Sequence, residues 1–148
     1  MDTDPATPQA LAEFRAAREA LFRAFDHDLR QGRSANEIAR MAQGTVSRPV
    51  VLAYLTAKRV AADVRRMLRS AGLDGLFGAE ITGETGRGAR EVCVMLVVDP
   101  REVVDDRDSV VARLVDLLRA NNLRLDAPWR GSLAEALWDG EPVRLHRP

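Results

Sequence analysis

Arginine side chains are the main candidates for a functional role in this chain. Their excess over acidic side chains is confined to one stretch. Residues 30–72 carry nine basic side chains and two acidic ones, although the chain of 148 residues has no formal net charge. The segments on both sides are net acidic. Guanidinium groups bind phosphate oxygens and the O6 and N7 atoms of guanine. A local positive field therefore favours a nucleic-acid partner in spite of the neutral total.

The sequence Ser47-Arg48-Pro49 is typical of the start of a helix. Serine is a frequent N-cap, and proline is tolerated in the first turn because its missing N–H would have no partner there. The free N–H groups and the dipole of a helix N-terminus favour a phosphate. We therefore predict a helix whose leading edge, with Ser47 and Arg48, faces outward and can fit against DNA.

One long helix is expected before this element, over residues 8–31. Gly32 is a suitable stop, and the apolar side chains recur at helical spacing. They form a single stripe: Leu11, Phe14, Leu21, Phe22, Phe25 and Leu29. The simplest expectation is that this stripe packs as core against neighbouring helices, and the alternative is the seam of a dimer.

Two further helices follow the long one. Ser34 and Glu37 have the spacing of a capping box, so a short helix is expected between them and Gly44. Its inward residues would be Ile38, Ala39 and either Ala42 or Met41. The next helix, opened by Ser47, would place Val51, Tyr54 and Leu55 inward. It is expected to end at Gly72, either unbroken to about Ser70 or bent near Thr56.

The stretch "EIARMA" followed by "VSRPVVLAYL" resembles the helix-turn-helix of bacterial DNA-binding proteins, of the homeodomain-like or resolvase type. The resemblance rests on seven residues: Ile38, Ala39, Val46, Ser47, Val51, Tyr54 and Leu55. The turn over residues 42–46 is longer than is usual for the motif. The resemblance implies a trihelical unit in which the helix opened by Ser47 enters the major groove.

The residues expected to contact DNA follow from that placement. Arg33, Arg40 and Thr45 would hold backbone phosphates. Ser47 and Arg48 would lie at the leading edge, where Arg48 can bind guanine. Leu52 would touch thymine methyl groups or be shielded by protein. The remaining candidates lie further along the same helix: Thr56, Lys58 and Arg59.

Residues 73–148 mix strand, turn and helix patterns, unlike the preceding residues, and are expected to form a small α+β unit. "AEITGE" and "REVCVMLVVDP" read as a β-hairpin whose second strand is central in a sheet, because it is apolar on both faces. A helix capped by Asp105, Asp106 or Asp108 follows, and "LRLDA" alternates like a short strand. In residues 132–148 the patterns disagree, since a capping box indicates a helix and Asp139-Gly140 indicates a hairpin.

Three residues of this half have alternative roles. Arg87, at the tip of the expected hairpin, could enter a minor groove as part of a wing, but an ordinary turn is favoured. Trp129 and Trp138 could line a small-molecule pocket or a protein contact, and core packing is the preferred interpretation.

Catalysis is not expected. His27 is flanked by acids that point in other directions on a helix, and His146 is close to the C-terminus. No Cys/His spacing suits a metal, no cofactor is implied, and Cys93 reads as buried packing. The longest apolar run, residues 92–98, is too short to cross a bilayer, and the N-terminus does not resemble a secretory signal. A cytoplasmic protein is expected.

The expected fold class is therefore α+β, with a helix-turn-helix domain over residues 1–72 and an α+β dimerisation or sensing domain over residues 73–148. The expected function is sequence-specific binding of double-stranded DNA by a bacterial transcriptional regulator, or by a phage or plasmid maintenance factor. A homodimer is expected because one short motif reads few base pairs, and a small-molecule effector is possible. The alternative is a non-enzymatic protein–protein interaction module built on the trihelical domain.

Overall fold

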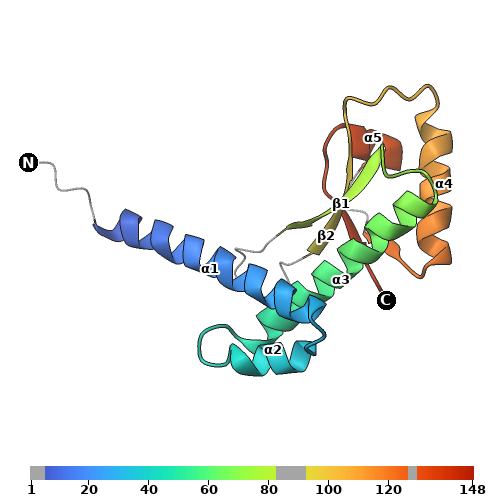
Figure 1. Ribbon diagram of the computed structural model, residues 1–148. Coiled ribbons are helices and arrows are strands. Elements are labelled where there is room, and N and C mark those ends of the chain that lie inside the picture. The colour runs from blue at the N-terminus through green and yellow to red at the C-terminus, as the bar shows by residue number, and fades with distance from the viewer. Residues whose placement is uncertain (1–5, 83–92, 127–129) are drawn as a thin grey trace, which may run out of the picture.

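The chain folds as an α+β protein with a helical N-terminal region (Figure 1). A computed structural model describes residues 6–82, 93–126 and 130–148. In chain order the elements are α1 (Ala6–Arg30), α2 (Ala35–Met41), α3 (Arg48–Ser70), β1 (Phe77–Thr82), β2 (Cys93–Val98), α4 (Arg107–Ala120), β3 (Arg124–Asp126), α5 (Leu133–Trp138) and β4 (Val143–His146).

Two capping boxes fix the starts of α2 and α5. The Glu37 backbone N–H donates to Ser34 Oγ at 3.2 Å, and the Ser34 N–H donates back to Glu37 Oε2 at 2.8 Å. Ser132 and Glu135 make the same pair of bonds, both at 3.1 Å. The ambiguous segment therefore starts as a helix, and Asp139 is the C-cap of α5 and not the tip of a hairpin.

The third helix is unbroken, which decides between the two expected forms. α3 runs for 23 residues without a bend at Thr56. Gly72, at φ +69°, ends the helical region, and the Leu73 N–H returns to the Leu68 carbonyl at 2.8 Å. This left-handed residue is the kind of helix stop for which glycine is suited.

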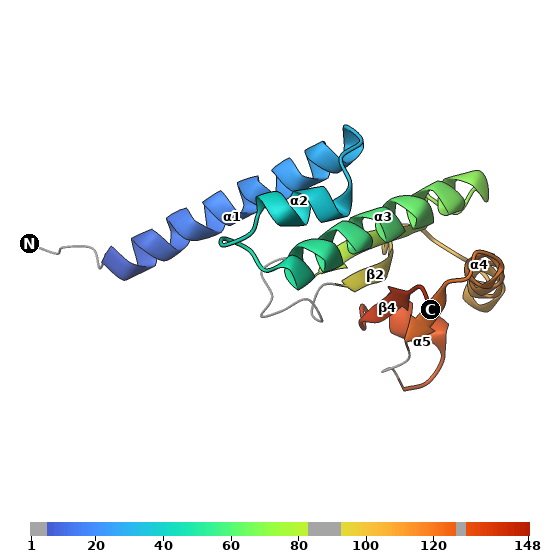
Figure 2. The same cartoon turned by 90° about the horizontal axis from the view of Figure 1, so that it is seen from below.

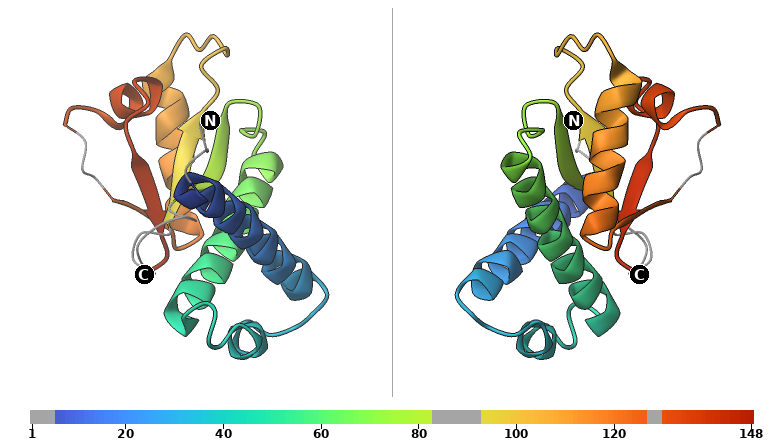
Figure 3. Two further views of the ribbon diagram at one scale, coloured as in Figure 1. Left: turned by 90° about the vertical axis from the view of Figure 1, so that its left-hand side faces the viewer. Right: turned by 90° about the vertical axis from the view of Figure 1, so that its right-hand side faces the viewer.

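The four strands form one antiparallel sheet in the order β1-β2-β4-β3. β2 is central, as its apolar sequence predicted, and pairs with β1 from Thr82↔Cys93 to Phe77↔Val98. α3 and α4 lie over the same face of the sheet (Figure 3). The connection between β1 and β2, with Arg87 at the expected hairpin tip, lies outside the described residues, so the choice between an ordinary turn and a wing stays open.

The buried residues form two clusters, and α3 belongs to both. Val51, Tyr54 and Leu55 pack with α1 and α2 in the first cluster. The next three turns pack against the sheet, α4 and α5 in the second, with Ala57, Val60, Ala61, Val64 and Leu68. Figure 2 shows α3 continuing from the helical region along the sheet. One rigid element therefore joins the two expected domains.

The expectation that the whole stripe of α1 forms core is wrong for its N-terminal half. Phe22 and Phe25 are buried, and the Phe22 ring lies edge-on to Tyr54 with centroids 4.5 Å apart. Leu11 and Phe14 are 47% and 66% exposed, because α1 extends past the two helices on which it packs (Figure 1). On α2 the open choice is also settled, since Ala42 is buried while Met41 is exposed.

Candidate nucleic-acid interface

The turn between α2 and α3 presents the start of α3 to solvent. The N–H groups of Thr45 and Val46 both donate to the Ala42 carbonyl at 3.0 Å, and Gly44 has φ +90°. Val46 packs against the trihelical core and anchors the turn. The leading edge of α3, residues 47–49, is exposed and is not covered by the described parts of the chain.

Ser47 occupies the N-cap position of α3, but its side chain makes no capping hydrogen bond. The predicted N-cap position is therefore confirmed, without the side-chain hydrogen bond that an N-cap serine commonly makes. Pro49 in the first turn has no N–H to satisfy, which lowers the need for a side-chain acceptor. The remaining N–H groups of this turn are left without the Ser47 hydroxyl as a partner, which suits an anionic ligand at this end.

Arg48 is held in place by α2. Its Nη2 donates to Asn36 Oδ1 at 2.8 Å, across the motif. A guanidinium has further N–H donors beyond the one used here. The contact therefore orients Arg48 while leaving part of its fork available. Asn36 was not among the residues singled out from the sequence, and nothing in its local pattern indicated this role.

Arg40 joins Ser47 and Arg48 around a hollow beside the turn. The hollow is lined by Ala39, Arg40, Gln43, Gly44, Val46, Ser47 and Arg48. Arg40 is exposed at the last turn of α2, and Thr45 is exposed in the turn itself. Four of the sequence-predicted residues thus come together at one end of the motif, which we call the tip: Arg40, Thr45, Ser47 and Arg48.

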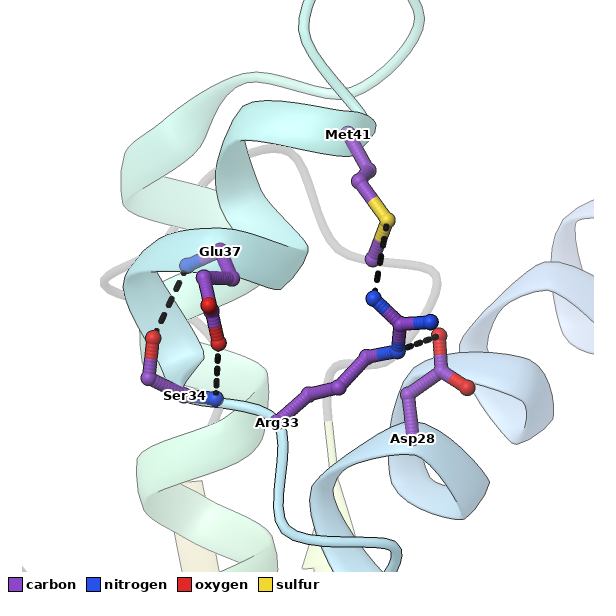
Figure 4. A network of polar contacts seen from close by, with 5 residues as sticks. All are labelled: Asp28, Arg33, Ser34, Glu37 and Met41. Atoms are coloured by element: carbon purple, nitrogen blue, oxygen red, sulfur yellow. Dashed lines mark hydrogen bonds and ion pairs between the residues drawn. The ribbon is translucent and has the colours of Figure 1, made fainter.

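Arg33 is engaged within the protein instead. Its Nε lies 4.0 Å from the Asp28 carboxylate, and its Nη1 lies 4.0 Å from the sulfur of Met41 (Figure 4). Asp28 partly neutralises this guanidinium, so its charge is less available to a phosphate than that of Arg40 or Arg48.

Glu37 is the one acidic residue of α2, and its carboxylate accepts a hydrogen bond from the Ser34 N–H in the capping box. The backbone N–H of Ser34, followed by the Ser34 hydroxyl interaction, lowers the pKa of Glu37 below its usual value of 4.5 (Figure 4). The ionised carboxylate therefore stabilises the start of α2.

Leu52 and Thr56 face a second feature, a groove between α3 and the ends of strands β2, β3 and β4. Its lining residues are Leu52, Ala53, Thr56, Ala57, Val60, Cys93, Val94, Asp126, Arg144, Leu145, His146 and Arg147. Leu52 is half-buried, which agrees with the expected alternative of shielding by protein. Sequence reasoning missed Arg144 and Arg147, although Arg144 alternates with the buried Val143 and Leu145 of β4 in the manner of a strand.

Lys58 and Arg59 take different directions on α3. The Lys58 ammonium lies 5.4 Å from the centroid of the Tyr54 ring and is half-buried. Arg59 is exposed, and its spacing of eleven residues from Arg48 returns it to nearly the same face of the helix. Of these two bases, Arg59 is the better placed for a ligand that also touches Arg48.

No protein-family model, curated protein or solved structure matches this chain. Within the described residues no group of three or more His, Cys, Asp and Glu side chains could hold a metal ion. None of the described helices has the length and apolar character of a membrane span.

The two tryptophans divide between the described and the undescribed parts of the chain. Trp138 packs edge-on to Phe77 with ring centroids 6.1 Å apart, and the guanidinium of Arg107 lies 4.8 Å from its ring centroid. This is the core packing that was preferred for Trp138. Trp129 lies outside the described residues.

Proposed function

We propose that this protein binds double-stranded DNA sequence-specifically through the N-terminal edge of α3. The observation that supports the proposal is the exposed Arg48, oriented by Asn36 and flanked by Arg40 at the tip. A side chain that recognises a base needs a fixed orientation and N–H groups that are available for hydrogen bonds. The arrangement around Arg48 supplies both.

The trihelical core gives the edge a rigid support. Val51 is fully buried and Tyr54 and Leu55 are each 2% exposed, so the inner face of α3 is committed to packing. Arg48 at the first turn and Arg59 further along lie on one line beside this inner face, and both are exposed to an approaching ligand. The major groove admits an α-helix presented in this way.

The biological role that follows is gene regulation or plasmid or phage maintenance, in the cytoplasm of a bacterium. Such a protein would act as a homodimer, because two copies of a short motif double the sequence that is read. A small molecule that binds the α+β half could then alter DNA binding.

The experiment that tests this function is selection of random duplexes by the purified protein, followed by anisotropy titration of the enriched sequence. We expect an enriched site whose affinity falls steeply with salt. Arg48→Ala should weaken binding to the selected site about tenfold to a hundredfold. Arg113→Ala, which removes an exposed arginine of α4, is the matched control and should leave the affinity unchanged.

The contrary outcomes are equally specific. Equal affinity for selected and scrambled duplexes would exclude sequence reading. Equal loss in the Arg48 and Arg113 variants would exclude the tip as the reading site.

A second candidate, a protein–protein interaction module, is favoured by one observation. Leu11, Phe14 and Met41 are large apolar side chains exposed on the helical region. If this were the only function, the protein would retain no duplex even at low salt, and variants of these three residues would remove its protein partner.

A further inference from the structure

The N-terminal half of α1 is a helix with an uncovered apolar stripe. Figures 1 and 2 both show this end projecting away from the rest of the protein. From Ala6 to Ala20 every residue except Arg18 is exposed, including Phe14 at 66%. An isolated helix of about 15 residues is marginal in water without tertiary packing. A partner that covers the stripe would add stability to this segment beyond what its continuity with the packed half of α1 supplies.

The exposed stripe continues an established packing surface. Leu21 is half-buried and packs against the trihelical core, and Phe25 is 5% exposed within it. Leu11, Phe14 and Leu21 precede Phe25 at helical spacings, so they lie on the same side of α1. The face of α1 that packs on α2 and α3 in the C-terminal half of the helix is exposed to solvent in the N-terminal half.

Small and large residues alternate along a line beside this stripe, which shares Phe14 and Leu21 with it. The residues are Ala10, Phe14, Ala17, Leu21 and Ala24, with spacings of four, three, four and three. This is the spacing of a heptad seam. When two such helices pair in opposite directions, the two seam positions of a heptad face each other. Phe14 then faces the partner's Ala17, and Leu21 faces the partner's Ala10.

This pairing is self-complementary in volume. Each large side chain meets an alanine of the other copy, which lets the two helices approach and interlock. A parallel pair would place Phe14 against its own equivalent, and alanine against alanine, and would leave gaps between the bulky layers.

The charged residues fit the same pairing. Arg15 and Glu19 are one helical turn apart and lie to the side and rear of the seam, where they remain hydrated. Arg18 flanks the seam, and its guanidinium lies 5.2 Å from the centroid of its own Phe22 ring. Its aliphatic stem would cover the partner's Leu11.

We propose that this protein forms a homodimer in which the N-terminal half of α1 pairs antiparallel with the same segment of a second copy. The pairing is centred between Arg15 and Ala16. It goes beyond DNA binding and does not depend on it. Of the two dimer contacts that the sequence offered, the stripe of α1 and residues 73–148, it selects the first.

The test is the oligomeric state of the full chain without DNA, measured by sedimentation equilibrium. We expect a dimer that Phe14→Glu converts to a monomer, because the seam would bury an unpaired carboxylate. Ala16→Glu adds the same charge to the rear of α1 and should leave the dimer intact. Phe14 is exposed in the single chain, so its replacement should not unfold the monomer, which circular dichroism will check.

The direction of pairing is tested by spin labels at Ala16 and Arg23, both on the rear face, in a Cys93→Ser background. In the antiparallel dimer the two labels at residue 16 lie almost level. The two at residue 23 are separated by about 21 Å more along the axis, at about 1.5 Å per residue. Equal distances at both positions would overturn the proposal. So would a wild-type monomer at about 100 μM, or a dimer that Phe14→Glu does not weaken.

Discussion

The side chain of Arg48, at the first residue of α3, donates a 2.8 Å hydrogen bond to Oδ1 of Asn36 on α2. The two residues are twelve positions apart, and the turn between the helices brings them together. α2 therefore both supports α3 through buried residues and fixes the direction of its leading arginine.

The first prediction concerns this contact. Asn36→Ala should weaken binding to the selected duplex several-fold, and less than Arg48→Ala does, because the guanidinium remains but is no longer oriented. Arg48→Lys should also lose discrimination, since an ammonium cannot bind guanine O6 and N7 in a bidentate manner. Anisotropy titrations of the selected and scrambled duplexes measure both effects.

A control for stability separates an effect on DNA binding from an effect on folding. Asn36→Ala should leave the melting temperature nearly unchanged, because both side chains of the contact are exposed. If Asn36→Ala binds the selected duplex as tightly as the wild type, Asn36 does not position Arg48 for DNA.

The second prediction concerns the turn of the motif. Gly44 has φ +90°, so Gly44→Ala should destabilise the protein by about 1–2 kcal/mol through backbone strain, although a Cβ would meet no atom within 4 Å. Gly75→Ala is the control, because a Cβ there also meets nothing and Gly75 does not have a positive φ. Urea denaturation of both variants measures the difference, and equal stability would show that the turn does not require glycine.

The third prediction follows from the sharing of α3 between two cores. Val51 and Val64 are both fully buried, one in each cluster. Val51→Ala and Val64→Ala should each cost about 2 kcal/mol. Because a single helix joins the clusters, each variant should lower the transition seen by circular dichroism and by tryptophan fluorescence equally.

Tryptophan reports only on residues 73–148, where both tryptophans lie. If Val51→Ala lowered the circular dichroism transition and left the fluorescence transition in place, the helical region would unfold independently.

The fourth prediction is a pH dependence at α2. The Ser34 N–H lowers the pKa of Glu37 in the folded state below 4.5. The ionised form is favoured by folding, so its contribution to stability is present above about pH 4.5 and is lost as the pH falls through the lower folded value. Glu37→Gln keeps the capping geometry but cannot ionise. The variant should have a lower free energy of unfolding than the wild type at neutral pH. In acid the two free energies should become equal.

Chemical denaturation from pH 3 to 7 measures this convergence. Glu141→Gln, an exposed change of the same charge, is the control for net-charge effects. A wild-type advantage over Glu37→Gln that did not diminish in acid would contradict the prediction.

Much of the local structure could be predicted from the sequence because its causes are local. Ser34 and Glu37 are three residues apart, and so are Ser132 and Glu135, so each capping box could be read directly. Asp106 caps α4 within the range that was predicted. The apolar sequence of β2 indicated a central strand, and the sheet order confirms it.

The candidate site was predicted only in part. The choice of Arg40, Thr45, Ser47 and Arg48 followed from the resemblance to a helix-turn-helix. The structure brings Arg40, Ser47 and Arg48 around one hollow and leaves Thr45 exposed in the adjoining turn. The engagement of Arg33 by Asp28 and Met41 could not be predicted, because it depends on how α1 and α2 meet.

By itself, the sequence determined most of the helices and strands and which of their faces are apolar, since capping residues and side-chain periodicity act within a few residues. Only the tertiary structure decided that α3 is shared by two cores, that Leu52 and Thr56 face a groove beside β4, and that Phe14 is left bare. The physical reason is that a periodic apolar stripe identifies the face of a helix or strand that is favoured to be buried, but not the element that packs against it. In α1 the packing helices reach only as far as the C-terminal half.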